Sequence, residues 1–525
     1  MSKPAFVRRF TSVSFATMVS RAFGFLREIL LSRYLGVGAD AFLVAFRIPN
    51  MLRHIFVEGA LSAALVPTIV QAEQDKSTNQ ASRLVTVSLV IFEAVVLLLC
   101  ALVVANASFV VTIIAPGFDV GRISTAVPML QVMIFLIFFL SSNAIFAGAL
   151  HARNYFFVPA IAPAILNVAF IIGTTICLYQ RLEPLALTYM LILGGVAQLA
   201  LHVFMYKRAG YSFMLPNSTT WSMMRSVLGK LGPAIAGMSI FEVNLLLDNQ
   251  FASTLPTGSI SLLHYSSRFM GVPLGVFSIA FATVLLPHFA RVGRDNVERL
   301  SFYFQEALKT VFWITVPVGL LMALVTDKIF MTIYLSKHFT MIHVLQAQNL
   351  LLIFLSGLFF LSLNKIIMSL FYALHDTRGP WWISAVGIIS NLGFNLILIG
   401  PLGAYGLALA TVISAVLQVC AGFFVLSRRH NISLDRAELA DFFSRAAVQF
   451  LILLGAFYGI YRFVTWFIFR FCSANLAHML TDTICFWLWI APIGGTIWIL
   501  ILITRRLFGL RQYFIDGESA GSDVN

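Results

Sequence analysis

The chain has 525 residues; 59% of them are hydrophobic, only 11% are charged, and the mean hydropathy is +0.90. Soluble proteins are typically about 45–50% apolar and about 25% charged, so this composition excludes an ordinary water-soluble enzyme, a disordered chain and a small disulfide scaffold. A formal net charge of +13 would suit nucleic-acid binding, but in a membrane protein it also fits loops that face anionic lipid.

Continuous apolar runs of about 20 residues favour membrane-spanning helices over the shorter alternating strands of a β-barrel. They predict an all-α, polytopic membrane protein with about fourteen transmembrane helices. An even number of spans places both ends of the chain on the same side of the membrane. In chain order, the spans are expected at residues 10–32, 42–70, 84–114, 126–149, 158–179, 185–206, 227–253, 259–290, 304–325, 346–374, 382–399, 404–426, 442–466 and 483–504.

Lysine and arginine are unevenly distributed between the two sides of these spans. They gather at both ends of the chain and in the connections after even-numbered spans, by roughly three to one over the opposite connections. Because positively charged loops remain cytoplasmic, both termini are expected in the cytoplasm, and the charge is explained without a nucleic-acid partner. Expected cytoplasmic positions include His151, Arg208, Arg294 and Arg429, and expected periplasmic positions include Asp119, Glu183 and Lys337.

Short sequence windows recur at a nearly constant offset. Residues 149–151 (Ala-Leu-His) return as residues 373–375, and Asn167 returns as Asn391, in both cases 224 residues later. An offset of six helices preserves topology, so the halves are expected to be parallel repeats around a central cavity. The predicted parts are an N-terminal lobe at 1–210, a C-terminal lobe at 220–430, two extra helices at 436–510 and a cytoplasmic tail at 511–525.

The first expected span carries three ionisable residues, Arg21, Arg27 and Glu28. A charged side chain at the centre of a bilayer costs at least about 2.5–3.5 kcal/mol, so such residues indicate function. Arg21 and Glu28 share a helix face, whereas Arg27 points about 120° away. Gly24 is expected to permit a bend that aims Arg27 inward. The alternative is that Arg27 and Glu28 only mark a helix end near water.

The second expected span is interrupted by Pro49, which removes a backbone donor and predicts a kink or a break. The same segment carries Asp40, Arg53 and Glu58. Since a broken helix at membrane depth is tolerated where it lines a cavity, this segment is expected to border a polar cavity. The alternative is a pair of helices that lies wholly at the membrane surface.

Arg268 is the lone charge of the eighth expected span. Arg21, Arg27, Arg53 and Arg268 thus come from both halves of the chain, and we expect their guanidinium groups to converge in the central cavity. Guanidinium binds phosphate through two parallel hydrogen bonds, so the cluster predicts a phosphate-bearing substrate and disfavours cationic drugs.

Together these motifs resemble the MurJ (MviN) family of lipid II flippases, within the superfamily of multidrug, oligosaccharidyl-lipid and polysaccharide exporters. The likeness covers the whole chain, fourteen spans included. Any one motif alone is weak, but their combination is specific. The motifs are Ser-Arg-x-x-Gly-Phe-x-Arg-Glu at 20–28, Asp-Ala-Phe at 40–42, Pro-Asn-x-x-Arg at 49–53, Phe-x-Glu-Gly-Ala at 56–60 and Val-Pro at 66–67.

The resemblance implies that the substrate is lipid II, the undecaprenyl-pyrophosphate-linked disaccharide pentapeptide of peptidoglycan synthesis. Alternating access would move it from the cytoplasmic to the periplasmic leaflet of the bacterial inner membrane, with no enzymatic step and no cofactor. The resemblance also implies that the four arginines bind this substrate and that helices 13 and 14 form a groove for its lipid tail. In some relatives an acid lies three positions after Arg268, where this chain has Gly271.

Some members of this family bind sodium, which would act here as a coupling ion. The matching positions are Asp248, Asn391, Asn395, the carbonyl of Leu407, and Thr411. Oxygen ligands suit such a hard cation, but Asn395 replaces an acid of the family's site, so weaker binding is expected. The equally weighted alternative is that the two asparagines only form hydrogen bonds between helices.

Glu28, Asp40 and Glu58 are interpreted as gating residues that pair with arginines in one orientation of the cavity. Arg33 lies seven positions before Asp40, and Arg53 precedes Glu58. The alternative for Asp40 is a cap on the N-terminus of its own helix, worth about 1 kcal/mol.

Other functions stay open at this point. An exporter of another polyprenyl-linked saccharide, or of drugs, would share the superfamily's fold. A membrane enzyme that acts on polyprenyl phosphates is disfavoured, because the sequence has no paired-aspartate cluster, no His-Glu-x-x-His and no phosphate-binding Gly-x-x-x-x-Gly-Lys loop. Membrane lipids are expected partners, and the sequence leaves the oligomeric state and the energy source open.

Overall fold

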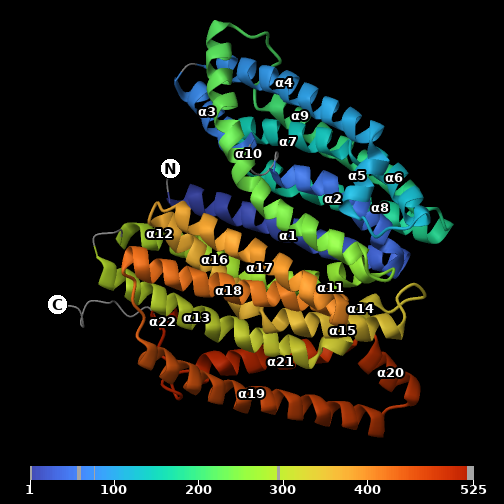
Figure 1. The fold of residues 1–525 in the computed structure, drawn as a ribbon, viewed down its shortest axis with the longest axis vertical. Coiled ribbons are helices and arrows are strands. Elements are labelled where there is room, and N and C mark those ends of the chain that lie inside the picture. Colours follow the sequence, from blue (N-terminus) through green and yellow to red (C-terminus); the bar gives the residue numbers. More distant parts are fainter. Residues whose placement is uncertain (1–2, 56–60, 76, 293–295, 517–525) are drawn as a thin grey trace. The chain divides into compact units, whose positions relative to one another are not determined.

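The computed structural model describes residues 3–55, 61–75, 77–292 and 296–516, and these ranges are built from α-helices (Figure 1). Within them there is no β-strand, only an isolated bridge between Ser336 and Phe339. The predicted all-α fold is confirmed. The chain divides into two compact units, Met1–Ser261 and Leu262–Asn525, and the lobe boundaries predicted above stay a prediction.

Eleven helices in the described ranges are long and apolar enough to cross a membrane, or twelve if the bent pair α15 (Met341–Ser356) and α16 (Leu358–Ala373) forms one span. The chain is therefore a multi-pass membrane protein, but the predicted count of fourteen is not confirmed. The first two expected spans merge into one apolar run, because a 3₁₀ turn joins α1 (Lys3–Leu35) directly to α2 (Asp40–Leu52).

The first unit is a bundle in which α8 packs on α1 and on α9, while α7 packs on α3, α4 and α9. Side-chain caps begin α4, α6 and α10: Ser77 Oγ accepts the Gln80 N–H at 3.2 Å, Asp119 Oδ1 accepts the Arg122 N–H at 2.7 Å, and Asn217 Oδ1 accepts the Thr220 N–H at 2.9 Å. After α1 and α2 come α3 (Ser62–Asp75), α4 (Thr78–Ala105), α5 (Ala107–Ile114), α6 (Val120–Met133), α7 (Leu136–Ala152), α8 (Phe157–Gln180), α9 (Pro184–Arg208) and α10 (Ser218–Ser253).

The second unit has its core where α12, α13, α16, α17 and α18 meet, around buried side chains such as Phe304, Ile366 and Phe371. The helices α17 and α18 lie side by side in Figure 1 and form an extended contact. A helix that begins in the first unit, α11 (Ser259–Pro273), leads into this part through a π-helical turn. The others are α12 (Ala280–Val292), α13 (Val297–Leu324), α14 (Thr326–Tyr334), α17 (Arg378–Leu402), α18 (Ala404–His430), α19 (Arg436–Phe471), α20 (Ala474–Asp482), α21 (Phe486–Thr504) and α22 (Tyr513–Asp516).

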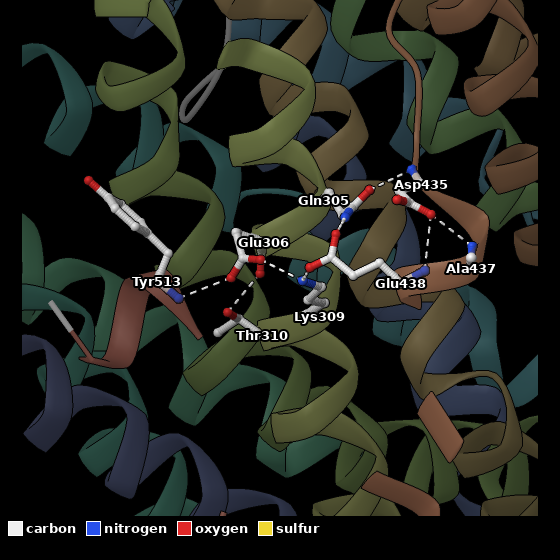
Figure 2. A network of polar contacts seen from close by, with 8 residues as sticks. All are labelled: Gln305, Glu306, Lys309, Thr310, Asp435, Ala437, Glu438 and Tyr513. Atoms are coloured by element: carbon white, nitrogen blue, oxygen red, sulfur yellow. Dashed lines mark hydrogen bonds and ion pairs between the residues drawn. The ribbon is translucent and has the colours of Figure 1, made fainter. Parts of the chain in front are cut away.

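Partly buried polar contacts tie the last helices of the chain to α13 (Figure 2). Lys309 Nζ lies 2.7 Å from Glu306 Oε1 and 2.5 Å from Glu438 Oε1, in the first turn of α19. Glu306 also accepts the backbone N–H of Tyr513, in α22, at 3.0 Å, and Gln305 donates to Glu438. The beginning of α19 and the short α22 are therefore held by neighbouring residues of one α13 segment. Lys309 and Glu306 are both buried, and removing one partner of such a pair typically costs about 3–5 kcal/mol, because it leaves an unpaired charge.

Gln449 connects the extra helices to the bundle of the second unit. Its Oε1 accepts the Trp313 indole N–H at 3.0 Å, and its Nε2 donates to the Ile501 carbonyl at 2.8 Å and to Thr504 Oγ1 at 3.0 Å. The amide is fully buried, so these bonds satisfy it while they join α13, α19 and α21.

Candidate functional site

Arg27 is held between α1 and α8 by three different groups. Its Nη1 donates to Asn167 Oδ1 at 3.2 Å, and its Nη2 lies 2.5 Å from Glu28 Oε1. Its guanidinium carbon lies 5.2 Å from the centre of the Phe170 ring. Glu28 is buried, whereas the Arg27 side chain is 18% exposed. Because a guanidinium has five N–H donors, Arg27 retains donors for a second anion.

Asn167 acts as the anchor between these two helices. While its oxygen accepts from Arg27, its Nδ2 donates to the Ser20 carbonyl at 3.1 Å. A Cβ at Gly24 would lie 3.5 Å from that nitrogen, so Gly24 borders Asn167 closely. The helix α1 continues through Gly24, and the bend expected there stays a prediction. Arg27 is oriented by Asn167 across the interface between α1 and α8.

Arg53 begins a second polar chain, which runs from the end of α2 to α10. Its Nη2 lies 3.0 Å from Asn50 Oδ1 and 2.8 Å from His54 Nε2. His54 Nδ1 lies 2.9 Å from Glu242 Oε1, with Glu242 buried and the His54 side chain 33% exposed. The sequence did not predict this pairing. The α-helix continues through Pro49 and ends at Leu52, so Arg53 lies where α2 stops.

Asp40 lies at the beginning of α2 but does not cap that helix. Its Oδ2 accepts the Gly258 N–H at 2.6 Å, and its Oδ1 accepts the N–H and the hydroxyl of Ser261 at 2.8 and 2.5 Å. Gly258 has a φ of +96°, which glycine adopts without strain, and it immediately precedes α11. Asp40 therefore caps the beginning of α11, where the helix dipole favours a negative charge. The alternative in which it caps its own helix is wrong, and its gating role stays a prediction.

Arg268 is exposed on α11. Two residues beside it, Tyr265 and Phe269, are buried against α14: Tyr265 lies 5.2 Å from Tyr334 and Phe269 lies 5.3 Å from Phe330, between ring centres. This aromatic face fixes the rotation of α11 in its unit and leaves Arg268 on the side that does not pack on α14.

The predicted arginine cluster is distributed over both units. Arg27 and Arg53 are partly buried and Arg21 is exposed in the first unit, while Arg268 belongs to the second. Their convergence in a central cavity stays a prediction. Glu58 lies outside the described residues.

The positions matched to a sodium site also fall in both units, with Asp248 in α10 and the others in α17 and α18. In the second unit, Asn395 Nδ2 donates to Asn391 Oδ1 at 2.9 Å, and the Thr411 hydroxyl donates to the Leu407 carbonyl at 3.1 Å. Both bonds run within one helix, not between helices. The oxygens have the chemistry that a hard cation prefers, but these two acceptors already receive a hydrogen bond. Sodium binding stays a prediction.

Glu93 is a buried acid that the sequence analysis did not single out. Its Oε1 accepts the hydroxyls of Ser141 and Ser142, on α7, at 2.7 and 2.9 Å. The signal was present, because Glu93 is the one acidic residue of α4, whose apolar 18-residue window has a mean hydropathy of 3.0. Within the described ranges, no group of three or more His, Cys, Asp and Glu side chains is placed to hold a metal ion.

The comparison with known families decides what kind of membrane protein this is. The family model described as lipid II flippase MurJ matches residues 31–476. The chain belongs to the MurJ lipid II flippase family. A probable lipid II flippase MurJ of Haemophilus influenzae is 31% identical over 465 residues, which cover 84% of this chain and 88% of that protein. The family resemblance predicted from the sequence is confirmed.

Solved structures show that the fold is shared more widely. A lipid II flippase MurJ in an inward closed conformation has a TM-score of 0.74 at 23% identity and covers 94% of this chain and 99% of that one. An inward-facing multidrug transporter of the MATE family and MOP superfamily has a TM-score of 0.65 at 14% identity. The match covers 81% of this chain and 98% of that one. The family therefore shares its helical architecture with the superfamily named from the sequence.

Proposed function

We propose that this chain moves lipid II from the cytoplasmic to the periplasmic leaflet of the bacterial inner membrane by alternating access, without chemical conversion of the substrate. The observation that carries the proposal is the guanidinium of Arg27, placed inside a membrane-spanning helix pair and oriented by Asn167 and Phe170. Charge-assisted bonds from guanidinium to phosphate are roughly twice as strong as neutral ones, which suits a pyrophosphate headgroup.

Glu28 allows the Arg27 guanidinium to exchange one anionic partner for another. In the present state it lies 2.5 Å from Arg27 and occupies part of the guanidinium. A pyrophosphate would compete with Glu28 for these donors, and Glu28 would recover them when the substrate leaves. Such a difference in pairing between the two states is what a ligand needs to shift a conformational equilibrium.

A multidrug exporter is the second candidate of the same superfamily, but the arginines oppose it. Arg27 and Arg53 lie in or at the end of membrane helices, where positive charge repels cationic drugs. An exporter of another polyprenyl-linked saccharide shares the phosphate chemistry, so it must be separated from lipid II transport by experiment.

The proposed orientation has both termini in the cytoplasm, and the transport cycle is driven by the membrane potential or by sodium as a coupling ion. One charge that crosses the membrane gains about 2.3 kcal/mol per 100 mV, which is enough to bias the return of the empty cavity.

Single cysteines at positions 119 and 429 test the orientation. External reagent is expected to label position 119 only, and the reverse pattern would contradict the proposal.

The decisive test uses purified protein in liposomes that carry labelled lipid II in one leaflet. Lipid II is expected to cross, with the imposed potential and the sodium gradient varied independently to identify the driving force. A different polyprenyl-linked saccharide and a cationic dye serve as rival substrates. Rescue of cells depleted of their own lipid II flippase is the expected parallel result. Transport of the dye or the other saccharide in preference to lipid II would overturn the proposal.

A further inference from the structure

The first unit contains a cavity of about 190 Å³ between α4, α7 and α10. None of the four arginines lines it, so it is separate from the residues proposed to bind the substrate. Its wall is almost wholly apolar and includes Phe92, Val96 and Leu99 from α4, Ile137 and Ser141 from α7, and Leu231 from α10.

The described part of the wall offers too few polar groups to hold water. Among the lining residues that the structure describes, Ser141 is the only polar one, and its hydroxyl already donates to Glu93 at 2.7 Å. An ordered buried water needs about two to four polar partners. An engineered apolar cavity of about 150 Å³ in another protein stays dry and binds benzene, so a cavity of this size and lining suits a hydrocarbon.

The cavity is continuous with the outer surface of the helices. Two of its wall residues are also exposed, Val95 to 53% and Leu228 to 45%. Exposed apolar side chains continue along α4 at Val90 and Leu98. Because α4 has the apolar length of a membrane span, this surface faces lipid chains, and a chain can enter the cavity without crossing water.

We propose that this cavity binds the end of an acyl chain of a bilayer phospholipid, inserted between α4, α7 and α10. An empty void deprives its lining of dispersion contacts, and a hydrocarbon chain restores them without any polar group to desolvate. Phospholipid chains are the most concentrated hydrocarbon at the opening, so mass action favours them over the rarer polyprenyl chains. The site lies beyond the proposed transport function, and its absence would leave that function untouched.

The test uses the full-length protein in liposomes that contain a phospholipid with a photoactivatable diazirine near the end of one acyl chain. After illumination, mapped peptides are expected to carry the label at the wall residues of α4, α7 and α10. Val96→Phe places a ring in the cavity and is expected to reduce this labelling several-fold. Leu98→Phe makes a similar change on the exposed face of α4, where Leu98 is 62% exposed, and is expected to leave the labelling unchanged.

Three results would overturn the proposal. The first is wall labelling no higher than that of the exposed α4 surface, and the second is equal labelling of wild type and Val96→Phe. The third is loss of the label when undecaprenyl phosphate is added in equal amount, which would identify a polyprenyl chain as the occupant. Leu231→Phe fills the same cavity from α10 and replaces Val96→Phe if that variant does not accumulate.

Discussion

Asn167 and Asn391 are separated by the recurring sequence offset of 224 residues, yet their amides have different partners. Asn167 Oδ1 in α8 accepts from the guanidinium of Arg27 at 3.2 Å, across the interface with α1. Asn391 Oδ1 in α17 accepts from Asn395 at 2.9 Å, within its own helix. A repeated position therefore does not repeat its chemistry, because the neighbouring residues decide whether the amide orients a charge or only satisfies another amide.

The turns that follow α7 and α16 show a second contrast between the halves. After α7, the cation Arg153 lies 2.8 Å from Glu73. After α16, the anion Asp376 lies 2.9 Å from His430. The turn residue that forms the ion pair is thus a cation after α7 and an anion after α16.

The largest effect is expected from Arg27→Ala, which removes the charge that distinguishes the two asparagine sites. It should abolish rescue of flippase-depleted cells, with normal membrane insertion. Arg27→Lys should rescue only in part, because an ammonium group lacks the planar fork of guanidinium. Arg208→Ala, at the exposed end of α9 in the same unit, is the matched control and should behave as wild type. Full rescue by Arg27→Ala would remove the functional difference between the halves.

Asp40 and Glu28 are both buried carboxylates, but their partners differ. Asp40 accepts hydrogen bonds from neutral groups, whereas Glu28 pairs with the charged Arg27. Asp40→Ala leaves the donors of Gly258 and Ser261 without their acceptor, so we expect a loss of about 1–3 kcal/mol in unfolding free energy, measured by thermal unfolding in detergent. Asp40→Asn keeps one acceptor oxygen and should lose less. If Asp40→Asn also transports lipid II at the wild-type rate, the gating role of this residue is wrong.

Paired substitutions of the two asparagines test the comparison directly. Asn167→Ala removes a hydrogen bond to a charged group and should lower the initial lipid II flipping rate by roughly 3- to 10-fold. Asn391→Ala should cost about 1 kcal/mol of stability and leave that rate unchanged. Equal rates in the two variants would contradict the contrast. A change of sodium dependence in Asn391→Ala alone would support the sodium prediction.

The smallest effect concerns acidification of the turn after α16. Burial raises the pKa of Asp376, but hydrogen bonds from His430 and from the Gly379 and Arg378 N–H groups hold that pKa below its ordinary range. Stabilisation by a depressed pKa is complete above the unfolded value of about 3.9 and is lost as the pH falls through the lower folded value. Wild type should therefore lose thermal stability below about pH 4 more steeply than Asp376→Asn. Parallel curves for the two proteins would contradict this assignment.

The sequence was most informative about Arg27 and least informative about its partners. An arginine within an apolar run of residues 10–32 is visible without a structure, because its cost in a bilayer is a local property. Asn167 lies 140 positions away, and nothing in either window indicates that their side chains meet. The same holds for His54 and Glu242, which are 188 positions apart. Whether α1 bends at Gly24 stays a prediction, while the partners that hold Arg27 on α8 come from the tertiary structure.

Membrane class, helical fold and family were determined by the sequence alone, because they depend on apolar run length, charge distribution and short motifs, all of which are local. Only the tertiary structure decided that α1 and α2 join through a 3₁₀ turn, that Asp40 caps α11 and that Glu93 receives two serine hydroxyls. These outcomes depend on which helix faces meet and at what distance. Hydrogen bonds require partners within about 3 Å, and packing brings distant residues that close by a geometry that no local pattern encodes.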